Sequence, residues 1–218
     1  MQKTCPDRYA PCYVVLMLTS LLAVLVVTPP HTALANSVVT CDYVRDEPQT
    51  EAERLEREQR DIWWQEYVAY SAMLPAEPDT RLRMPVSGVR VSQVADTWGA
   101  PRGVGRRHEG QDIFAPRGTP IYSATEGYLW RIGTSQRGGL TVWVVGPGGR
   151  RYYYAHLERY GENIREGDYV TTDTIIGYVG NTGNAVTTPP HLHFGVYYGS
   201  RRTCNRQVFD PLPLLVNR

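Results

Sequence analysis

Short runs of strand-forming residues, separated by turn residues, fill the chain from about Val89 onward, and this pattern most constrains the fold. The runs "GYLWRIG", "LTVWVV", "RYYYAHL" and "HLHFGVYY" are rich in β-branched and aromatic residues, which favour strands. The segment "GPGG" between the second and third runs indicates a hairpin. No segment after residue 88 has the apolar spacing of a long helix. The pattern therefore predicts an all-β domain.

A different pattern precedes this domain. The segment "EAERLEREQRDIWWQEYVAYSAML" has early acids, many helix formers and no Gly or Pro, which predicts a helix over residues 50–74. Packing of its apolar stripe on the β domain is the simpler interpretation, and docking of a regulatory protein is the alternative. We predict a linker over residues 75–84 and the β domain over 85–215. The stripe consists of Leu55, Ile62, Trp63, Tyr67, Tyr70 and Leu74.

The first residues have the layout of a secretory signal peptide. Two basic residues precede the 15-residue run "YVVLMLTSLLAVLVV", and "ALA" at 33–35 is a suitable cleavage site. The run is short for a membrane span, and an uncleaved anchor is the alternative. We predict a signal peptide over 1–35, an N-terminal extension over 36–49, and a periplasmic or secreted protein. Membrane contact is expected only through the signal segment.

Export determines which cysteines remain in the mature chain and whether they can form a disulfide. Removal of residues 1–35 leaves Cys41 and Cys204 in a compartment that permits disulfides. A disulfide between them and two free thiols both remain open. The formal net charge is +1, which leaves no electrostatic case for a nucleic-acid partner.

Four histidines remain after the predicted cleavage, and two of them lie one residue apart. Alternate residues of a strand point to the same face, so His191 and His193 are expected side by side. In "HEGQD", His108 and Asp112 are four residues apart, and Gly110 permits a bend between them. His108, Asp112 and one histidine of the pair would supply the three protein ligands of a catalytic zinc site, which keeps one position open.

The fourth histidine, His156, lies in "RYYYAHL". Strand alternation places it on the same face as Tyr152 and Tyr154. His156 and the remaining histidine of the 191/193 pair would then lie beside the metal and transfer protons. Zinc lowers the pKa of bound water to about 7, so the predicted chemistry is hydrolysis of an amide bond.

Three separated motifs occur in a recognisable order. They are "HEGQD", followed by "APRGTPIYSATEG"; "YAHL", followed by "IIGYVGNTGNA"; and "HLHF". With these motifs the chain resembles the M23 family of zinc metallopeptidases, the lysostaphin/LytM-like endopeptidases, from about residue 85 to 213. Two prolines precede the last motif where the family commonly has Gly-Pro, a departure that affects only the shape of the loop.

The resemblance implies a mainly β, antiparallel domain, here preceded by an α-helical segment. It also implies roles for the site residues: zinc ligands His108, Asp112 and His193, with His156 and His191 assisting catalysis. The implied function is an exported zinc endopeptidase that cleaves peptidoglycan stem peptides or cross-bridges.

Two other functions remain as alternatives: a non-catalytic module that binds the cell wall or activates other hydrolases, and a zinc peptidase acting on some other protein or peptide. The sequence leaves open which bond is cut, the oligomeric state, and whether the N-terminal segment blocks the groove.

Overall fold

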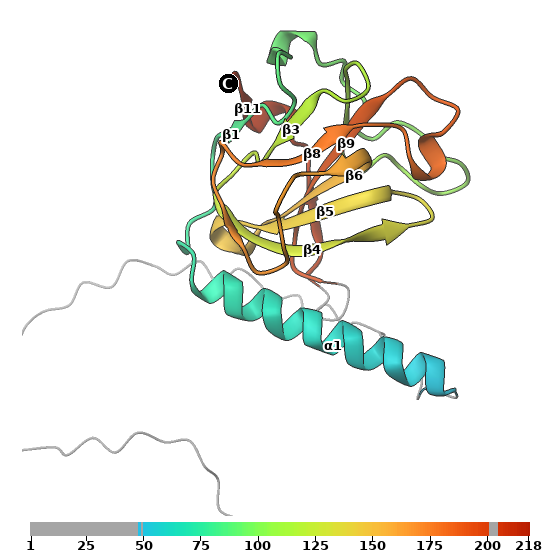
Figure 1. Ribbon diagram of the computed structural model, residues 1–218, viewed down its shortest axis with the longest axis vertical. Helices are drawn as coiled ribbons and strands as arrows, with labels where there is room; N and C mark the ends of the chain where they lie inside the picture. Colours follow the sequence, from blue (N-terminus) through green and yellow to red (C-terminus); the bar gives the residue numbers. More distant parts are fainter. Residues whose placement is uncertain (1–47, 49, 201–204) are drawn as a thin grey trace, which may run out of the picture. The chain divides into compact units, whose positions relative to one another are not determined.

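The computed structural model describes residues 48, 50–200 and 205–218 (Figure 1). The predicted signal peptide, most of the predicted N-terminal extension, Cys41 and Cys204 lie outside these residues. Within the described part of the chain, no helix has the length and apolar character needed to cross a membrane.

One α-helix and eleven strands make up the described regular structure, together with four short 3₁₀ helices. The helix is α1 (Glu51–Ala72). The strands are β1 (Leu82–Arg83), β2 (Gln111–Phe114), β3 (Pro120–Tyr122), β4 (Gly127–Ser135), β5 (Gly139–Val145), β6 (Arg151–Tyr160), β7 (Tyr169–Val170), β8 (Ile175–Val179), β9 (His191–Tyr198), β10 (Gln207–Phe209) and β11 (Leu215–Val216). The 3₁₀ helices are η1 (Val91–Gln93), η2 (Pro147–Gly149), η3 (Gly183–Ala185) and η4 (Leu212–Leu214).

Nine strands form one antiparallel sheet. Its main order is β10-β9-β6-β5-β4-β7, with β2 paired to β9 and with β8 paired to both β6 and β3. β5 and β6 form the expected hairpin across "GPGG". A mainly β, antiparallel domain preceded by a helix is therefore confirmed.

The core includes residues that the sequence assigned to a linker. Leu82 and Met84 are fully buried with the side chains of the large sheet. β1 also pairs in parallel with β11 near the end of the chain. The last residues of the predicted linker 75–84 are thus part of the folded domain. Local composition did not reveal this because their partners lie about 130 residues away in the chain.

α1 begins at a capping box, in which Thr50 and Glu53 satisfy each other's backbone N–H groups. Its second half packs against the sheet beside β4 (Figure 1). Tyr67 is buried against Trp130, and the Trp130 indole donates to the carbonyl of Trp63 at 2.7 Å. This half fits the packing interpretation of the stripe.

The first half of α1 is different. Leu55 and Ile62 belong to the predicted stripe but are 56% and 49% exposed. The stripe is therefore buried only where the helix lies against the sheet. Docking of a regulatory protein through the 50–74 helix stays a prediction.

Removing one hydroxyl should weaken the attachment of α1. The buried Tyr67 hydroxyl donates to the carbonyl of Gly149 at 2.9 Å. Tyr67→Phe leaves that carbonyl unsatisfied, so we expect it to lower the free energy of unfolding by about 1–3 kcal/mol. Chemical denaturation measures this change. Tyr178→Phe is the matched control, since that hydroxyl has no partner among the described residues, and an equal loss in both variants would contradict the prediction.

Candidate metal centre

Strand pairing brings the first two site residues together. β2 and β9 are antiparallel neighbours, and Asp112 and His193 are direct partners in their register. The side chains of His191 and His193 line the same cavity, as the alternation along β9 predicts. His108 precedes β2 and reaches the same point across the bend at Glu109 and Gly110.

Three potential ligand atoms converge there. His108 Nε2 lies 3.0 Å from Asp112 Oδ1, His193 Nδ1 lies 3.1 Å from the same oxygen, and the two ring nitrogens are 2.8 Å apart. Two imidazole nitrogens and one carboxylate oxygen form a donor set that suits zinc. His108, Asp112 and His193 could therefore hold a metal ion.

Outer contacts orient His108, the first potential ligand. His108 Nδ1 lies 2.7 Å from the carbonyl oxygen of Thr97, so Nδ1 carries the hydrogen and Nε2 keeps its lone pair for a metal. The Thr97 hydroxyl lies 3.0 Å from the Asp112 backbone nitrogen. The sequence did not indicate Thr97, because a threonine in an irregular segment carries no signal of this role.

Asp112 is held as an ionised carboxylate. Burial raises its pKa, but the adjacent imidazoles of His108 and His193 outweigh burial and hold the pKa well below its usual range. Its second oxygen pairs with the Arg102 guanidinium. The carboxylate is thus charged and oriented from both sides, as a metal ligand must be.

Gly110 allows the close approach of this bend to β9. A Cβ atom at this position would lie 2.6 Å from the Phe194 carbonyl oxygen and 2.8 Å from His193 Cε1. Such contacts would force the ligand ring or the strand to move. Only glycine fits here without displacing a ligand.

We therefore expect Gly110→Ala to weaken metal binding at this site roughly 10–100-fold, the range seen when support around a ligand is lost. Competition with a chromogenic chelator measures the affinity. Gly133→Ala is the matched control, because its Cβ would meet nothing within 4 Å. Unchanged affinity in Gly110→Ala would contradict the proposed role of this contact.

His156 occupies a β-bulge. The prediction that its side chain shares a strand face with Tyr152 and Tyr154 is therefore wrong. On β5, the single residue Thr141 faces two residues of β6, Ala155 and His156. His156 has a φ of +64°, uncommon for a residue other than glycine. The bulge turns its ring into the cavity, whereas Tyr152 and Tyr154 point into the core. Strict alternation could not anticipate an extra residue in the strand.

The two remaining histidines are oriented alike. His156 Nδ1 lies 2.8 Å from the carbonyl oxygen of Thr182, and His191 Nδ1 lies 2.8 Å from that of Pro189. Each Nδ1 therefore carries the hydrogen, and each Nε2 keeps a lone pair. His191 Nε2 is 3.8 Å from Asp112 Oδ1, and the ring centroids of His156 and His191 are 5.0 Å apart.

Burial has the largest effect on the pKa of the His156 imidazole. It lowers the pKa to about 4, and the hydrogen bond with Thr182 only partly opposes it. The ring is therefore neutral near pH 7 and able to accept a proton.

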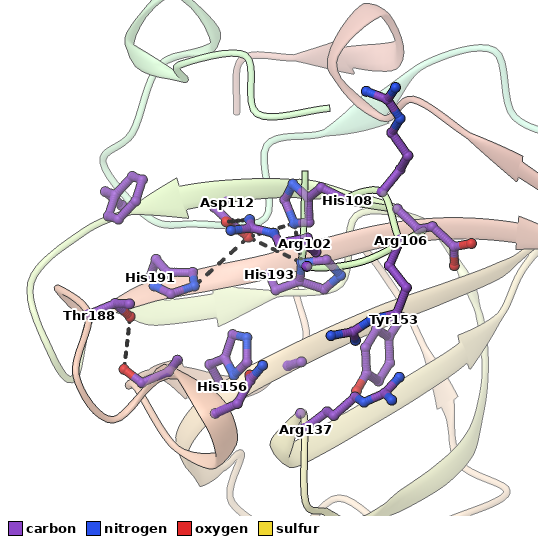
Figure 2. A pocket seen from close by; sticks show the side chains of 18 of the residues that line it. Arg102, Arg106, His108, Asp112, Arg137, Tyr153, His156, Thr188, His191 and His193 are labelled. Carbon is purple, nitrogen blue, oxygen red and sulfur yellow. Dashed lines mark hydrogen bonds and ion pairs between the residues drawn. The ribbon is translucent and has the colours of Figure 1, made fainter. Parts of the chain in front are cut away.

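Figure 2 shows these side chains lining one pocket. The volume of this open cavity is about 1070 Å³. All five residues singled out from the sequence line it: His108, Asp112, His156, His191 and His193.

Comparison with known proteins agrees with this geometry. The family model "Peptidase family M23" matches residues 106–211. The catalytic domain of lysostaphin from Staphylococcus simulans is 34% identical, over 56% of this chain and 92% of that chain, with a TM-score of 0.48. The chain belongs to peptidase family M23. A LytM structure from Ruminococcus gnavus is 25% identical, covers 79% of this chain and 77% of that chain, and has a TM-score of 0.51.

Curated M23 relatives are longer than the matched segment. The L-Ala–D-Glu endopeptidase of Bacillus subtilis (strain 168) is 38% identical over 126 residues, 55% of this chain and 38% of that protein. Full-length lysostaphin from Staphylococcus simulans is 37% identical over 118 residues, 53% of this chain and 23% of that protein. The chain thus spans less than half the length of these relatives.

Proposed function

We propose that this chain is an exported zinc-dependent endopeptidase that hydrolyses peptide cross-links of bacterial peptidoglycan. One observation carries the proposal: three ligand atoms converge beside two further histidines whose Nε2 atoms are free to accept protons. Membership of family M23 supports the peptidase class. The names of the relatives, an L-Ala–D-Glu endopeptidase and lysostaphin, support a cell-wall peptide as substrate.

In this proposal, His108 Nε2, Asp112 Oδ1 and His193 Nδ1 hold the zinc ion. When bound, zinc supplies a Lewis acid that polarises a carbonyl group and activates water. The ionised Asp112 offsets part of the positive charge of the ion.

His156 and His191 move the protons. Both rings donate through Nδ1 to fixed backbone carbonyls, so each Nε2 presents its lone pair to the cavity. One ring takes a proton from the attacking water and later returns one to the leaving amine. The resulting imidazolium stabilises negative charge that develops on the carbonyl oxygen.

Export rests on the sequence pattern of residues 1–35. It places the enzyme in the periplasm or outside the cell, where peptidoglycan is accessible. The proposal assigns membrane contact only to this segment.

The decisive test measures zinc and hydrolysis together. We expect the purified protein to contain about one zinc ion per chain and to release peptide fragments from peptidoglycan, identified by mass spectrometry. Zinc binding with no released fragments would instead favour the non-catalytic cell-wall module. Cleavage of unrelated peptides but not of peptidoglycan would favour the alternative of a general peptidase.

A further inference from the structure

The walls of the cavity carry an excess of positive charge. Two carboxylates line it, those of Glu109 and Asp112. Four arginines line it as well: Arg102, Arg106, Arg107 and Arg137. Figure 2 labels all of them except Arg107.

Of the four lining arginines, only Arg102 pairs with a carboxylate among the described residues. Arg107 donates instead to the backbone carbonyl of Gly99 at 3.1 Å. Glu109 pairs with Arg206, which lies outside the lining set. Asp112 is engaged by the site histidines and Arg102. Among the residues that the structure describes, neither Arg106 nor Arg137 has a carboxylate partner. Both lie exposed at a site that binds a peptide in the proposed function.

The backbone at Arg137 is anchored beside the proposed proton carrier. The carbonyl of Arg137 accepts from the Asn184 amide at 3.0 Å, and that of Gly138 accepts from the His156 amide at 2.7 Å. The turn between β4 and β5 is thereby held against η3 and β6. The guanidinium of Arg137 thus projects from a fixed base next to His156.

Arg106 lies on the opposite loop, which leads to the first ligand. Its carbonyl accepts from the Arg102 amide at 3.0 Å. The ends of this loop are tied where the Gly99 amide donates to the His108 carbonyl at 3.0 Å and the His108 amide donates to the Ala100 carbonyl at 2.9 Å. The two unpaired arginines therefore come from two loops that each adjoin a site histidine.

We propose that Arg106 and Arg137 bind carboxylates of the substrate peptide, so the enzyme prefers acidic stem peptides to uncharged glycine bridges. This inference rests on the proposed function and specifies its substrate. A guanidinium donates parallel hydrogen bonds to a carboxylate and stays charged at every relevant pH. Stem peptides carry free carboxylates on their acidic residues, whereas a polyglycine bridge carries none.

The test compares two synthetic stem peptides that differ only in whether their carboxylates are free or amidated. We expect kcat/KM to be at least roughly tenfold higher for the free acid, because one charge-assisted hydrogen bond can supply a factor of this size. Arg106→Gln and Arg137→Gln should each reduce this acid-to-amide ratio roughly tenfold. Arg165→Gln, an exposed arginine outside the cavity, should leave the ratio unchanged.

Equilibrium binding separates this inference from the proposed function. Calorimetry with zinc-loaded His191→Ala compares the affinities of the two peptides without turnover. Equal affinities, equal kcat/KM values, or faster cleavage of pentaglycine would overturn the role of the arginines and leave a peptidase. Tighter binding of the acid with no hydrolysis by the unaltered protein would sustain the arginine site and reject the peptidase.

Discussion

His193→Ala should remove zinc from the protein and abolish hydrolysis with it. His193 Nδ1 lies 2.8 Å from His108 Nε2 and 3.1 Å from Asp112 Oδ1, so the variant leaves two of three ligand atoms. Losing a direct ligand should weaken zinc binding by more than the roughly 10–100-fold loss typical of an outer contact. Atomic absorption after dialysis measures the zinc content, and the rate of fragment release gives the activity.

Two Asp→Asn variants, one at the site and one at the surface, supply the control for this experiment. Asp112→Asn removes the charge of the third ligand and should also lower zinc content, whereas Asp173→Asn changes a carboxylate whose side chain is 92% exposed. Zinc should stay at the level of the unaltered protein in Asp173→Asn. Full zinc occupancy in His193→Ala would show that the ion is held elsewhere.

His191→Ala should keep zinc and lose turnover. His191 Nε2 lies 3.8 Å from Asp112 Oδ1, farther than the ring nitrogens of His108 and His193, and its Nδ1 is engaged by Pro189. Loss of a proton-transfer group costs typically 10²–10⁴-fold in rate, so we expect kcat to fall by about that factor. Zinc content and kcat are measured on the same preparation.

His156→Ala is the companion variant. Its neutral ring faces the same cavity from the bulge in β6, so the same loss of kcat with zinc retained is expected. Full activity in either variant would refute its role in proton transfer. Loss of zinc from either variant would instead identify that histidine as a ligand.

Local patterns were sufficient for the β character of the domain. The strand-forming runs from Val89 onward and "GPGG" correspond to strands and to the β5–β6 hairpin. A strand needs only two-residue alternation and suitable side chains, which are properties of neighbouring residues. The helix was visible for the same reason, and α1 lies within the predicted range 50–74.

Long-range pairing decided what these patterns missed. Leu82 and Met84 belong to the core because β1 meets β11. Leu55 and Ile62 follow the helical stripe, yet the sheet does not cover them. Burial depends on which distant surface lies opposite, and a local sequence pattern does not contain that information.

The sequence alone determined which five side chains to consider: the spacing within "HEGQD" and "HLHF" singled out four of them, and "YAHL" supplied His156. Only the tertiary structure decided how they meet. The β2–β9 register sets Asp112 opposite His193, and a bulge turns His156 toward them. Backbone carbonyls of Thr97, Thr182 and Pro189 orient the rings. Carbonyls are common to every residue, so their positions depend on the folded backbone and not on side-chain identity.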